Sequence, residues 1–294
     1  MTSSLLVTGA RGQLGRDVAA AAARAGITRI HAPSSAELDI TDPAAVSSAI
    51  SQAACGERLV VINAAGYTAV DAAQREAAAR AHAVNAHGPA NLARACAAHQ
   101  VHLVHVSTDY VFAGDSEGPN QVDGPTVPRT VYGRTKLAGE RAVLCSDASA
   151  HVVRTAWLYG AHGANFVRTM ARLANREAPV RVVDDQHGNP TWTADLADGL
   201  IALALAADRV PARVLHCVNT GTTTWFGLAR AVFAEIGADP GRVRPCSTAE
   251  FPRPAPRPAN SALDTTSWTT AGLPAPRPWR AALHAAIAAG VLGS

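Results

Sequence analysis

The sequence predicts an α/β fold: a Rossmann-type doubly wound parallel sheet joined to a smaller, interleaved C-terminal lobe. Two patterns predict it. Apolar runs alternate with alanine-rich helical stretches from the start of the chain, which is typical of a parallel sheet covered by helices on both faces. A glycine-rich turn also follows the first apolar run directly. We expect the sheet in residues 1–160, with later segments returning to it, and the smaller lobe mainly in residues 161–294.

The expected elements follow in order along the chain. Short apolar runs between turn residues predict strands, which we place at 4–8, 29–32, 59–63, 101–107, 151–156, 180–183 and 214–218. Stretches with helical periodicity lie between them, at 12–25, 43–54, 72–98 (interrupted near Gly88-Pro89), 129–144, 194–207 and 224–236. The proline-rich segment 251–258 (FPRPAPRP) is either a stiff loop, which we favour, or a polyproline ligand.

Composition excludes several classes of function. With 294 residues and 48% hydrophobic composition, the chain can bury a sizeable core. The net charge of +3 comes from dispersed arginines, which does not favour a nucleic-acid surface. No apolar run has the length of a membrane span, and the five cysteines are odd in number and scattered, so we expect a cytoplasmic protein with reduced thiols. The histidines are dispersed, and we predict no metal site.

Lys136 is the only lysine in the chain, and it lies four residues after Tyr132. On a helix these two side chains share a face. A nearby ammonium favours the phenolate, so we expect it to lower the pKa of the tyrosine. A tyrosine tuned in this way can protonate a developing alkoxide, which is acid catalysis suited to carbonyl reduction. The alternative is a surface lysine on a solvated helix.

The first glycine turn predicts a dinucleotide site. Gly9, Gly12 and Gly15 follow a strand and open a helix. In this context the glycines permit a tight turn and close approach of the backbone, and the helix N-terminus attracts a pyrophosphate. Within the turn, Arg11 is a candidate partner for a 2′-phosphate, while Gln13 and Leu14 begin the helix.

The end of the second strand bears on the choice of cofactor. A carboxylate there would bind the ribose 2′-hydroxyl of NAD and repel a 2′-phosphate. The segment 32–35 reads Ala-Pro-Ser-Ser, so together with Arg11 it favours NADPH, with NADH as the second candidate. Asp39 and Ile40 follow, and they either flank the adenine or form the entry to the next helix.

Thr108 ends the fourth expected strand, 24 residues before Tyr132. The carboxyl end of a parallel strand faces the ligand crevice, so the Thr108 hydroxyl is expected to hydrogen-bond a substrate carbonyl beside Tyr132. Alternatively, Ser107 and Thr108 only form a turn. We predict Thr108, Tyr132 and Lys136 as the catalytic residues.

With these motifs the chain resembles an extended short-chain dehydrogenase/reductase, and within that superfamily it resembles the dTDP-4-dehydrorhamnose reductase family. The resemblance covers nearly the whole chain. The matching stretches are GARGQLG from Gly9, ELDITD from Glu37, NAAGYTAVD from Asn63, VNAHGPANLA from Val84, STDYVFAG from Ser107, YGRTKLAGE from Tyr132, RTAWLYG from Arg154, GANFV from Gly163, VVDDQHGNPT from Val182 and RPANSALD from Arg257.

The resemblance implies roles for particular residues. The cofactor would lie on Gly9, Arg11, Gly12, Gln13, Leu14, Asp39, Ile40, Ala64, Ala65, Gly66, Tyr67, Tyr132 and Lys136. The substrate, a dTDP-sugar, would contact Thr108, Asp109, Trp157, Asn165 and Arg257. Residues 1–160 would then form the dinucleotide-binding domain and 161–294 mainly the nucleotide-sugar-binding lobe. Trp157 has a competing interpretation as a core residue.

The implied reaction is NAD(P)H-dependent reduction of the C4 ketone of a dTDP-4-dehydro-6-deoxy-L-sugar, with dTDP-4-dehydro-L-rhamnose preferred. Family members usually carry an aromatic residue and a glutamate in the segment that here reads 119–123, PNQVD. A related dTDP-4-keto-6-deoxysugar of secondary metabolism therefore stays open as the substrate. Asp17 replaces a glutamate linked to metal-dependent dimerisation in some members, so both a monomer and a homodimer stay open.

Two rivals to a reductase remain. A nucleotide-sugar dehydratase or epimerase of the same superfamily would need an acid pair after the threonine, and here Thr108 is followed by Asp109-Tyr110. A non-catalytic regulatory subunit of the same fold is the rival from another class. Intact Thr108, Tyr132 and Lys136 favour the enzyme.

Overall fold

A six-stranded parallel sheet forms the centre of the first half of the molecule, in a computed structural model that describes residues 4–54 and 58–293. The strand order is β10-β5-β4-β3-β1-β2. The strands are β1 (Ser4–Thr8), β2 (Arg29–His31), β3 (Leu59–Asn63), β4 (His102–Thr108), β5 (Ala150–Thr155) and β10 (Val214–His216). β1, β3, β4 and β5 are buried along their whole length, because helices cover both faces of the sheet.

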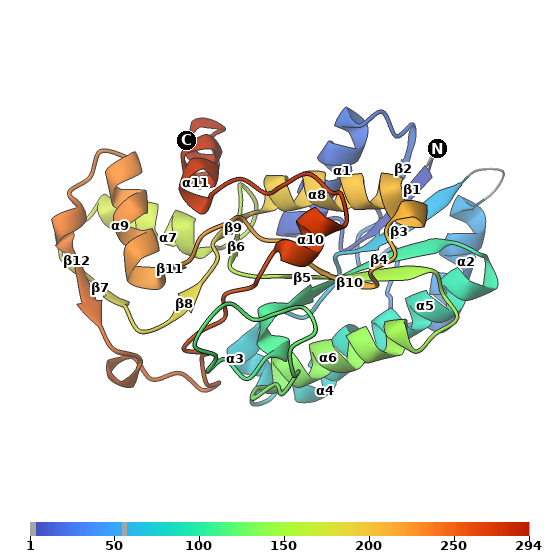
Figure 1. The fold of residues 1–294 in the computed structure, drawn as a ribbon, viewed down its shortest axis with the longest axis horizontal. Helices are drawn as coiled ribbons and strands as arrows, with labels where there is room; N and C mark the ends of the chain where they lie inside the picture. The colour runs from blue at the N-terminus through green and yellow to red at the C-terminus, as the bar shows by residue number, and fades with distance from the viewer. Residues whose placement is uncertain (1–3, 55–57, 294) are drawn as a thin grey trace.

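Helices lie in two layers (Figure 1). α1 (Gln13–Arg24) and α8 (Thr193–Ala206) pack side by side on one face of the sheet, in a core that includes Val18, Leu200 and, from α10 (Thr266–Thr270), Trp268. The other face is covered by α2 (Pro43–Ala53), α5 (Gly88–Ala98) and α6 (Val131–Leu144). The doubly wound α/β fold is therefore confirmed.

The smaller lobe has its own core around Phe233, Tyr159 and Trp279. Its helices are α7 (Phe166–Ala174), α9 (Trp225–Glu235) and α11 (Trp279–Ala288). Its strands pair two by two: β6 (Leu158–Tyr159) with β9 (Thr191–Trp192), β7 (Val180–Val183) with β12 (Val243–Cys246), and β8 (His187–Gly188) with β11 (Thr223–Thr224).

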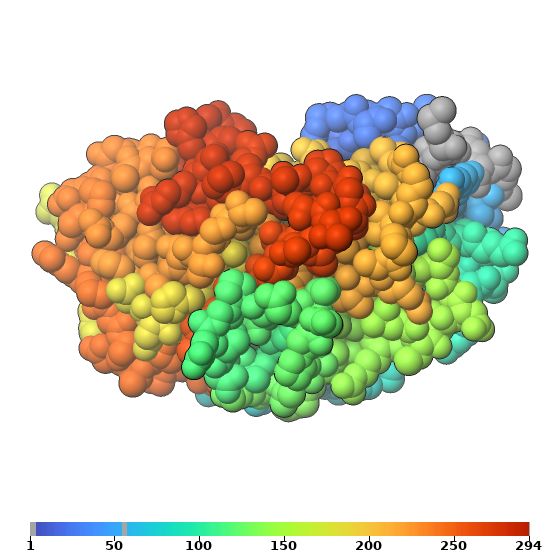
Figure 2. Space-filling view, in the orientation of Figure 1, coloured from blue at the N-terminus to red at the C-terminus, as the bar shows by residue number. Residues whose placement is uncertain are grey.

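The two halves are interleaved in the chain. β10 and α8 come after residue 160, yet they complete the sheet and cover it. Isolated bridges join Asp115 to Asn260 and Asn120 to Leu263. Figure 2 shows the result on one face of the molecule, where the green segment after β4 adjoins the orange-to-red C-terminal segment.

The region 72–98 is divided more than the expected helix with one interruption. α3 (Val70–Ala73) ends early, α4 (Ala78–His82) follows, and a π-helical turn over Ala83–His87 leads into α5. Gly88 and Pro89 begin α5 and do not interrupt it, because a proline in the first turn loses no helical hydrogen bond. The interruption that we predicted near Gly88-Pro89 is the π-helical turn that ends at His87, whereas the break between Ala73 and Ala78 was not predicted.

The remaining predicted elements lie within a few residues of those observed. The strand at 101–107 is shifted by one residue to His102–Thr108, and the strand at 214–218 ends at His216. α6 begins at Val131 because the Thr130 side chain accepts a hydrogen bond from the Gly133 N–H at 2.9 Å and caps the helix.

Among the described residues, no helix is both long and apolar enough to cross a membrane.

Two buried histidines at the end of the sheet away from the glycine turn form one hydrogen-bonded chain. His151 Nε2 lies 3.0 Å from the Val210 carbonyl and therefore carries the proton, so that His151 Nδ1 accepts from His102 Nε2 at 2.8 Å. His102 Nδ1 in turn lies 2.8 Å from the Ser149 hydroxyl. Both rings are neutral in this chain, and burial lowers the pKa of His102 to about 4.

We expect this pair to make the fold sensitive to acid. The unfolded chain binds a proton at His102 below about pH 6.5 and the folded chain does so only near pH 4, so stability is lost as the pH falls through that window. Unfolding in urea at pH 7 and pH 5 should show a loss of about 2 kcal/mol from this residue. His102→Gln should remove most of that loss of stability. His31 is exposed, and His31→Gln should remove none of it. An equal pH dependence in all three proteins would contradict the assignment.

Candidate active site

The main pocket, of about 840 Å³, opens between the two halves at the carboxyl ends of β3, β4 and β5. In doubly wound sheets this edge is where ligands bind. Twelve of the residues expected in the site line it: Gly12, Gln13, Leu14, Ala64, Ala65, Gly66, Thr108, Asp109, Tyr132, Lys136, Trp157 and Arg257. Gly9, Arg11, Asp39, Ile40, Tyr67 and Asn165 are not among its lining residues.

The glycine turn has the geometry that a pyrophosphate requires. Gly9 has φ +69°, and a Cβ there would fall 2.6 Å from the Ala65 nitrogen. A Cβ on Gly15 would fall 2.2 Å from the Gly9 carbonyl oxygen. Gly12 occupies the N-cap of α1, where no described side chain caps the helix, and Gly12, Gln13 and Leu14 line the pocket. These residues fit a dinucleotide cofactor.

The end of β2 holds a carboxylate that sequence reasoning missed. Glu37 turns back, and its carboxylate accepts a hydrogen bond from the Ser34 N–H at 2.7 Å. This bond, with a smaller contribution from Arg11, keeps the pKa of Glu37 below its usual value. The stretch 32–35 itself lacks a carboxylate, but the local turn from Ser34 to Glu37 brings one beside it.

Asp39 and Ile40 lie near this turn in different environments. Asp39 is exposed, and its Oδ1 accepts from the Thr41 N–H at 2.9 Å and from the Thr41 hydroxyl at 2.8 Å. Ile40 is buried against Gly88, where a Cβ would come within 2.4 Å of the isoleucine Cδ1. Asp39 therefore holds the entry to α2, whose N-cap is Asp42.

Asn85 positions the segment that follows β3, and sequence reasoning gave it no role. Its side-chain oxygen accepts from the Tyr67 N–H at 2.8 Å, and its amide donates to the Tyr67 carbonyl at 3.1 Å and to the Thr135 hydroxyl at 3.1 Å. Asn85 lies in the π-helical turn, a local form that often marks functional sites. It thereby ties Tyr67, beside Ala65 and Gly66, to the helix that carries Tyr132.

The structure brings Thr108, Tyr132 and Lys136 together in the pocket. Gly133 permits this, since a Cβ there would fall 2.2 Å from the Tyr110 carbonyl oxygen, so α6 packs directly on the turn after β4. The rings of Tyr110 and Tyr132 meet edge to face, with centroids 5.4 Å apart. Lys136 is buried, and its Nζ donates to the Val106 carbonyl at 2.7 Å.

The predicted effect of Lys136 on the pKa of Tyr132 is not what the structure shows. Burial raises the pKa of Tyr132 to about 12, partly offset by the Thr108 hydroxyl. Burial also lowers the pKa of Lys136 to about 8, partly offset by the Glu140 carboxylate. The sequence argument considered only charge on the helix face, and desolvation in this pocket outweighs it.

Asp109 is buried beside Thr108, with 4% of its surface exposed. The Thr108 hydroxyl donates to Asp109 Oδ1 at 2.7 Å, and among the described residues Oδ2 has no hydrogen-bond partner. Burial raises the pKa of Asp109 to about 6, with the nearby Thr108 and Ser261 hydroxyls working in the opposite direction.

Trp157 lines the pocket in a strained backbone conformation, with φ +47°. Its indole N–H donates to the Ser261 hydroxyl at 3.0 Å, and its ring stacks on Trp225 with centroids 3.6 Å apart. A Cβ on Gly188 would come 2.4 Å from the indole, so only glycine fits there. The ring is partly buried. It packs against the core of the smaller lobe and also forms part of the pocket wall.

Asn165 and Arg257, both expected at the substrate, make specific contacts within the protein. Asn165 caps α7, and its amide donates to the Gln13 side chain at 2.9 Å, so it connects the smaller lobe to the glycine turn. Arg257 pairs with Asp71 at 2.8 Å. Asp71 Oδ1 also accepts from the Ala255 N–H at 3.2 Å. This pair holds the proline-rich segment 251–258 against α3 as a pocket-lining loop.

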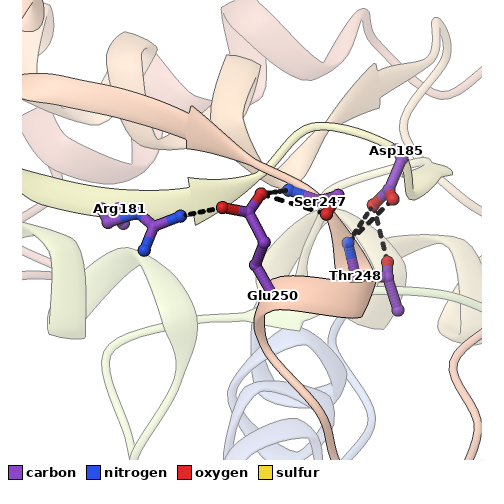
Figure 3. A network of polar contacts seen from close by, with 5 residues as sticks. All are labelled: Arg181, Asp185, Ser247, Thr248 and Glu250. Atoms are coloured by element: carbon purple, nitrogen blue, oxygen red, sulfur yellow. Dashed lines mark hydrogen bonds and ion pairs between the residues drawn. The ribbon is translucent and has the colours of Figure 1, made fainter.

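We call the part of the pocket that the smaller lobe lines its far arm. It contains two further arginines, Arg181 and Arg253. Figure 3 shows how Arg181 is held by Glu250 while Ser247 also bonds that carboxylate. In the same network the Thr248 hydroxyl donates to Asp185 at 2.6 Å. These contacts fix the turn that precedes Phe251 and Arg253 to strand β7.

No group of three or more potential metal ligands occurs within residues 4–54 and 58–293. His105 Nδ1 lies 2.9 Å from the Asn63 amide, separate from the His102 chain, as expected for opposite faces of β4. Asp17 accepts a hydrogen bond from Thr193 of α8.

Three features of this pocket define the extended short-chain dehydrogenase/reductase class. A tyrosine and a lysine lie one helical turn apart, a threonine ends the neighbouring strand, and a dinucleotide turn follows a strand two places away in the sheet. Within it the chain belongs to the RmlD substrate binding domain family, whose model matches residues 3–291.

Known proteins similar to this chain carry reductase names. A dTDP-4-dehydrorhamnose reductase from Mycobacterium tuberculosis is 53% identical over 290 residues, covering 97% of this chain and 92% of the relative. A probable dTDP-4,6-dihydroxy-2-methyloxan-3-one 4-ketoreductase from Streptomyces antibioticus is 48% identical, covering 96% and 94%. The crystal structure of a dTDP-4-dehydrorhamnose reductase from Bacillus anthracis in complex with NADP has 32% identity and a TM-score of 0.91, covering 98% and 100%.

Proposed function

We propose that this chain is an NADPH-preferring oxidoreductase that reduces the C4 ketone of a dTDP-4-dehydro-6-deoxy-L-sugar. The particular reaction that we propose converts dTDP-4-dehydro-L-rhamnose to dTDP-L-rhamnose. The observation that carries this proposal is the convergence of Thr108, Tyr132 and Lys136 in one pocket that extends from the glycine turn to the arginines of the smaller lobe. We place the reaction in the cytoplasm, where free thiols such as those of Cys96 and Cys217 persist.

Each residue has a distinct task in this reaction. When bound, the reduced nicotinamide supplies a hydride. Tyr132 keeps its proton throughout the neutral range, since its pKa is about 12, and gives it to the ketone oxygen. Lys136 is mostly protonated at pH 7, and its buried ammonium stabilises the phenolate that Tyr132 becomes.

Assays with several dTDP-4-keto sugars test the proposal, with NADPH oxidation as the readout. We expect dTDP-4-dehydro-L-rhamnose to give the highest kcat/KM. A higher value for another dTDP-4-keto-6-deoxysugar would reassign the chain to a related sugar reductase, and the Streptomyces antibioticus relative carries the name of such a 4-ketoreductase. Binding of dTDP and NADPH without any turnover would instead support a regulatory subunit.

Arg11 and Glu37 should have opposite effects on cofactor preference. A 2′-phosphate needs a positive partner and is repelled by a carboxylate. Arg11→Ala should weaken NADPH binding by about tenfold, the lower end expected for a lost contact to phosphate, and leave NADH nearly unchanged. Glu37→Gln should tighten NADPH. Calorimetry with both cofactors measures this, and equal weakening of the two in Arg11→Ala would make Arg11 a structural residue.

Arg257 should act on the substrate's diphosphate and not on the cofactor. Losing a charge-assisted contact to phosphate weakens binding by roughly ten- to a hundredfold, and because the diphosphate keeps its charge during reduction, Arg257→Ala should mostly raise KM. Calorimetry should show weaker dTDP binding and normal NADPH binding. Arg253→Ala is the companion variant, because Arg253 lines the same arm. If only Arg253→Ala weakens dTDP, Arg257 serves only to hold the loop through Asp71.

A further inference from the structure

The hydroxyl of Thr108 has one proton, and more than one neighbouring group could accept a hydrogen bond from it. In the structure it donates to Asp109 Oδ1 at 2.7 Å, and its oxygen accepts from the Tyr110 N–H at 3.3 Å. A hydroxyl can donate only one hydrogen bond. While Asp109 is a carboxylate, which only accepts hydrogen bonds, the Thr108 proton is committed to it. Thr108 then has nothing to donate to a ketone oxygen in the pocket.

The surroundings of Asp109 disfavour its charge. The side chain is buried, and among the described residues Oδ2 lacks a hydrogen-bond partner. A buried carboxylate with an unsatisfied oxygen is costly, and protonation removes the cost. Protonation also turns Asp109 into a donor. The acid O–H can then donate to Thr108, and the Thr108 proton becomes free to rotate toward the pocket.

We propose that Asp109 is a positioning residue whose protonation converts the Thr108 hydroxyl into a hydrogen-bond donor for the substrate ketone. The role depends on the proposed function, because it requires a ketone oxygen beside Tyr132. In this step Asp109 takes a proton from solvent and forms an O–H bond, one hydroxyl rotates, and nothing is oxidised or reduced.

The pH dependence of Asp109 can be separated from that of its neighbours. The titratable groups facing it are Tyr132 and Lys136 from α6 and Tyr110 from its own turn, with Arg257 across the pocket. Both tyrosines stay protonated below pH 8, because burial raises the pKa of each above its usual value. Burial holds the pKa of Lys136 near 8 and that of Asp109 near 6.

The first test compares the turnover of wild type and Asp109→Asn from pH 5 to pH 8 at saturating substrates. Titrations of the NADPH phosphate, the substrate and Lys136 affect both proteins and cancel in the ratio of their rates. We expect the ratio of wild type to variant to fall about tenfold between pH 5 and pH 7, as a group with a pKa near 6 ionises. Asp123→Asn, which removes an exposed carboxylate of the following loop, should keep the wild-type profile. A pH-independent ratio would overturn the proposal.

The second test does not need turnover. Carboxyl ¹³C signals of labelled aspartate should include one that titrates near pH 6 and disappears in Asp109→Asn. Thr108→Val should raise that midpoint, since the Thr108 hydroxyl stabilises the carboxylate, and should abolish the tenfold step in rate. A midpoint near 4 in wild type would overturn the proposal even if no sugar is reduced. A midpoint near 6 without turnover would instead count against the proposed function alone.

Discussion

Tyr132→Phe should lower kcat by about a hundredfold or more, the scale of a lost general acid. The phenol is the proton donor that we propose for the ketone oxygen, while the ring that packs on Tyr110 is kept, so the fold and NADPH binding should not change. Steady-state kinetics and cofactor calorimetry on the same preparation measure both effects.

A matched control exists for this substitution. Tyr159 is buried in the smaller lobe, and no partner for its hydroxyl occurs in the described part of the chain. Tyr159→Phe therefore deletes the same atom from a site without chemistry and should leave kcat unchanged. If Tyr132→Phe turned over within a few-fold of wild type, the proton would have to come from elsewhere.

Glu140→Gln should lower the free energy of unfolding by about 3–5 kcal/mol, the range for breaking a buried ion pair. Arg154 donates to the Glu140 carboxylate through Nε at 3.0 Å and Nη2 at 2.9 Å, with the two side chains 6% and 1% exposed. The variant leaves the guanidinium buried and uncompensated. Urea unfolding measures the loss.

Two further variants test the origin of that loss. Asp198→Asn removes an exposed partner of Arg24 and should cost less than about 1 kcal/mol. Glu140→Gln combined with Arg154→Met removes both charges and should recover part of the stability. A Glu140→Gln protein as stable as Asp198→Asn would show that the buried pair contributes little.

The strands and the catalytic helix could be predicted because their signals are local. Apolar runs locate β1 and β3, and the spacing of Tyr132 and Lys136 depends only on the helical repeat. Glu37 is only three residues after Ser34, and it was missed because the sequence argument examined the stretch 32–35 alone and not the local turn that follows it. Asn85 was missed for a different reason, since its partners Tyr67 and Thr135 are distant in sequence and meet it only in the folded protein.

The pKa of Tyr132 shows a second limit of sequence reasoning. Sequence places the ammonium of Lys136 one helical turn from the phenol, but it does not give the depth of the pocket. Burial acts on Tyr132 and Lys136 in opposite directions, raising one pKa and lowering the other. In the same way, the resemblance to the family predicts Arg257 as a cation near the substrate, but the sequence does not predict its pairing with Asp71.

The late position of β10 and α8 in the chain has a consequence for synthesis on the ribosome. Multidomain chains commonly fold their N-terminal unit first, while the rest is still being made. Here the apolar surface of β1 and α1 is covered by α8. Strand β5 can pair with its neighbour β10 only when residues 214–216 have been added. The nascent N-terminal half therefore keeps an exposed apolar face through much of translation, and this is the period in which we expect it to depend on chaperones.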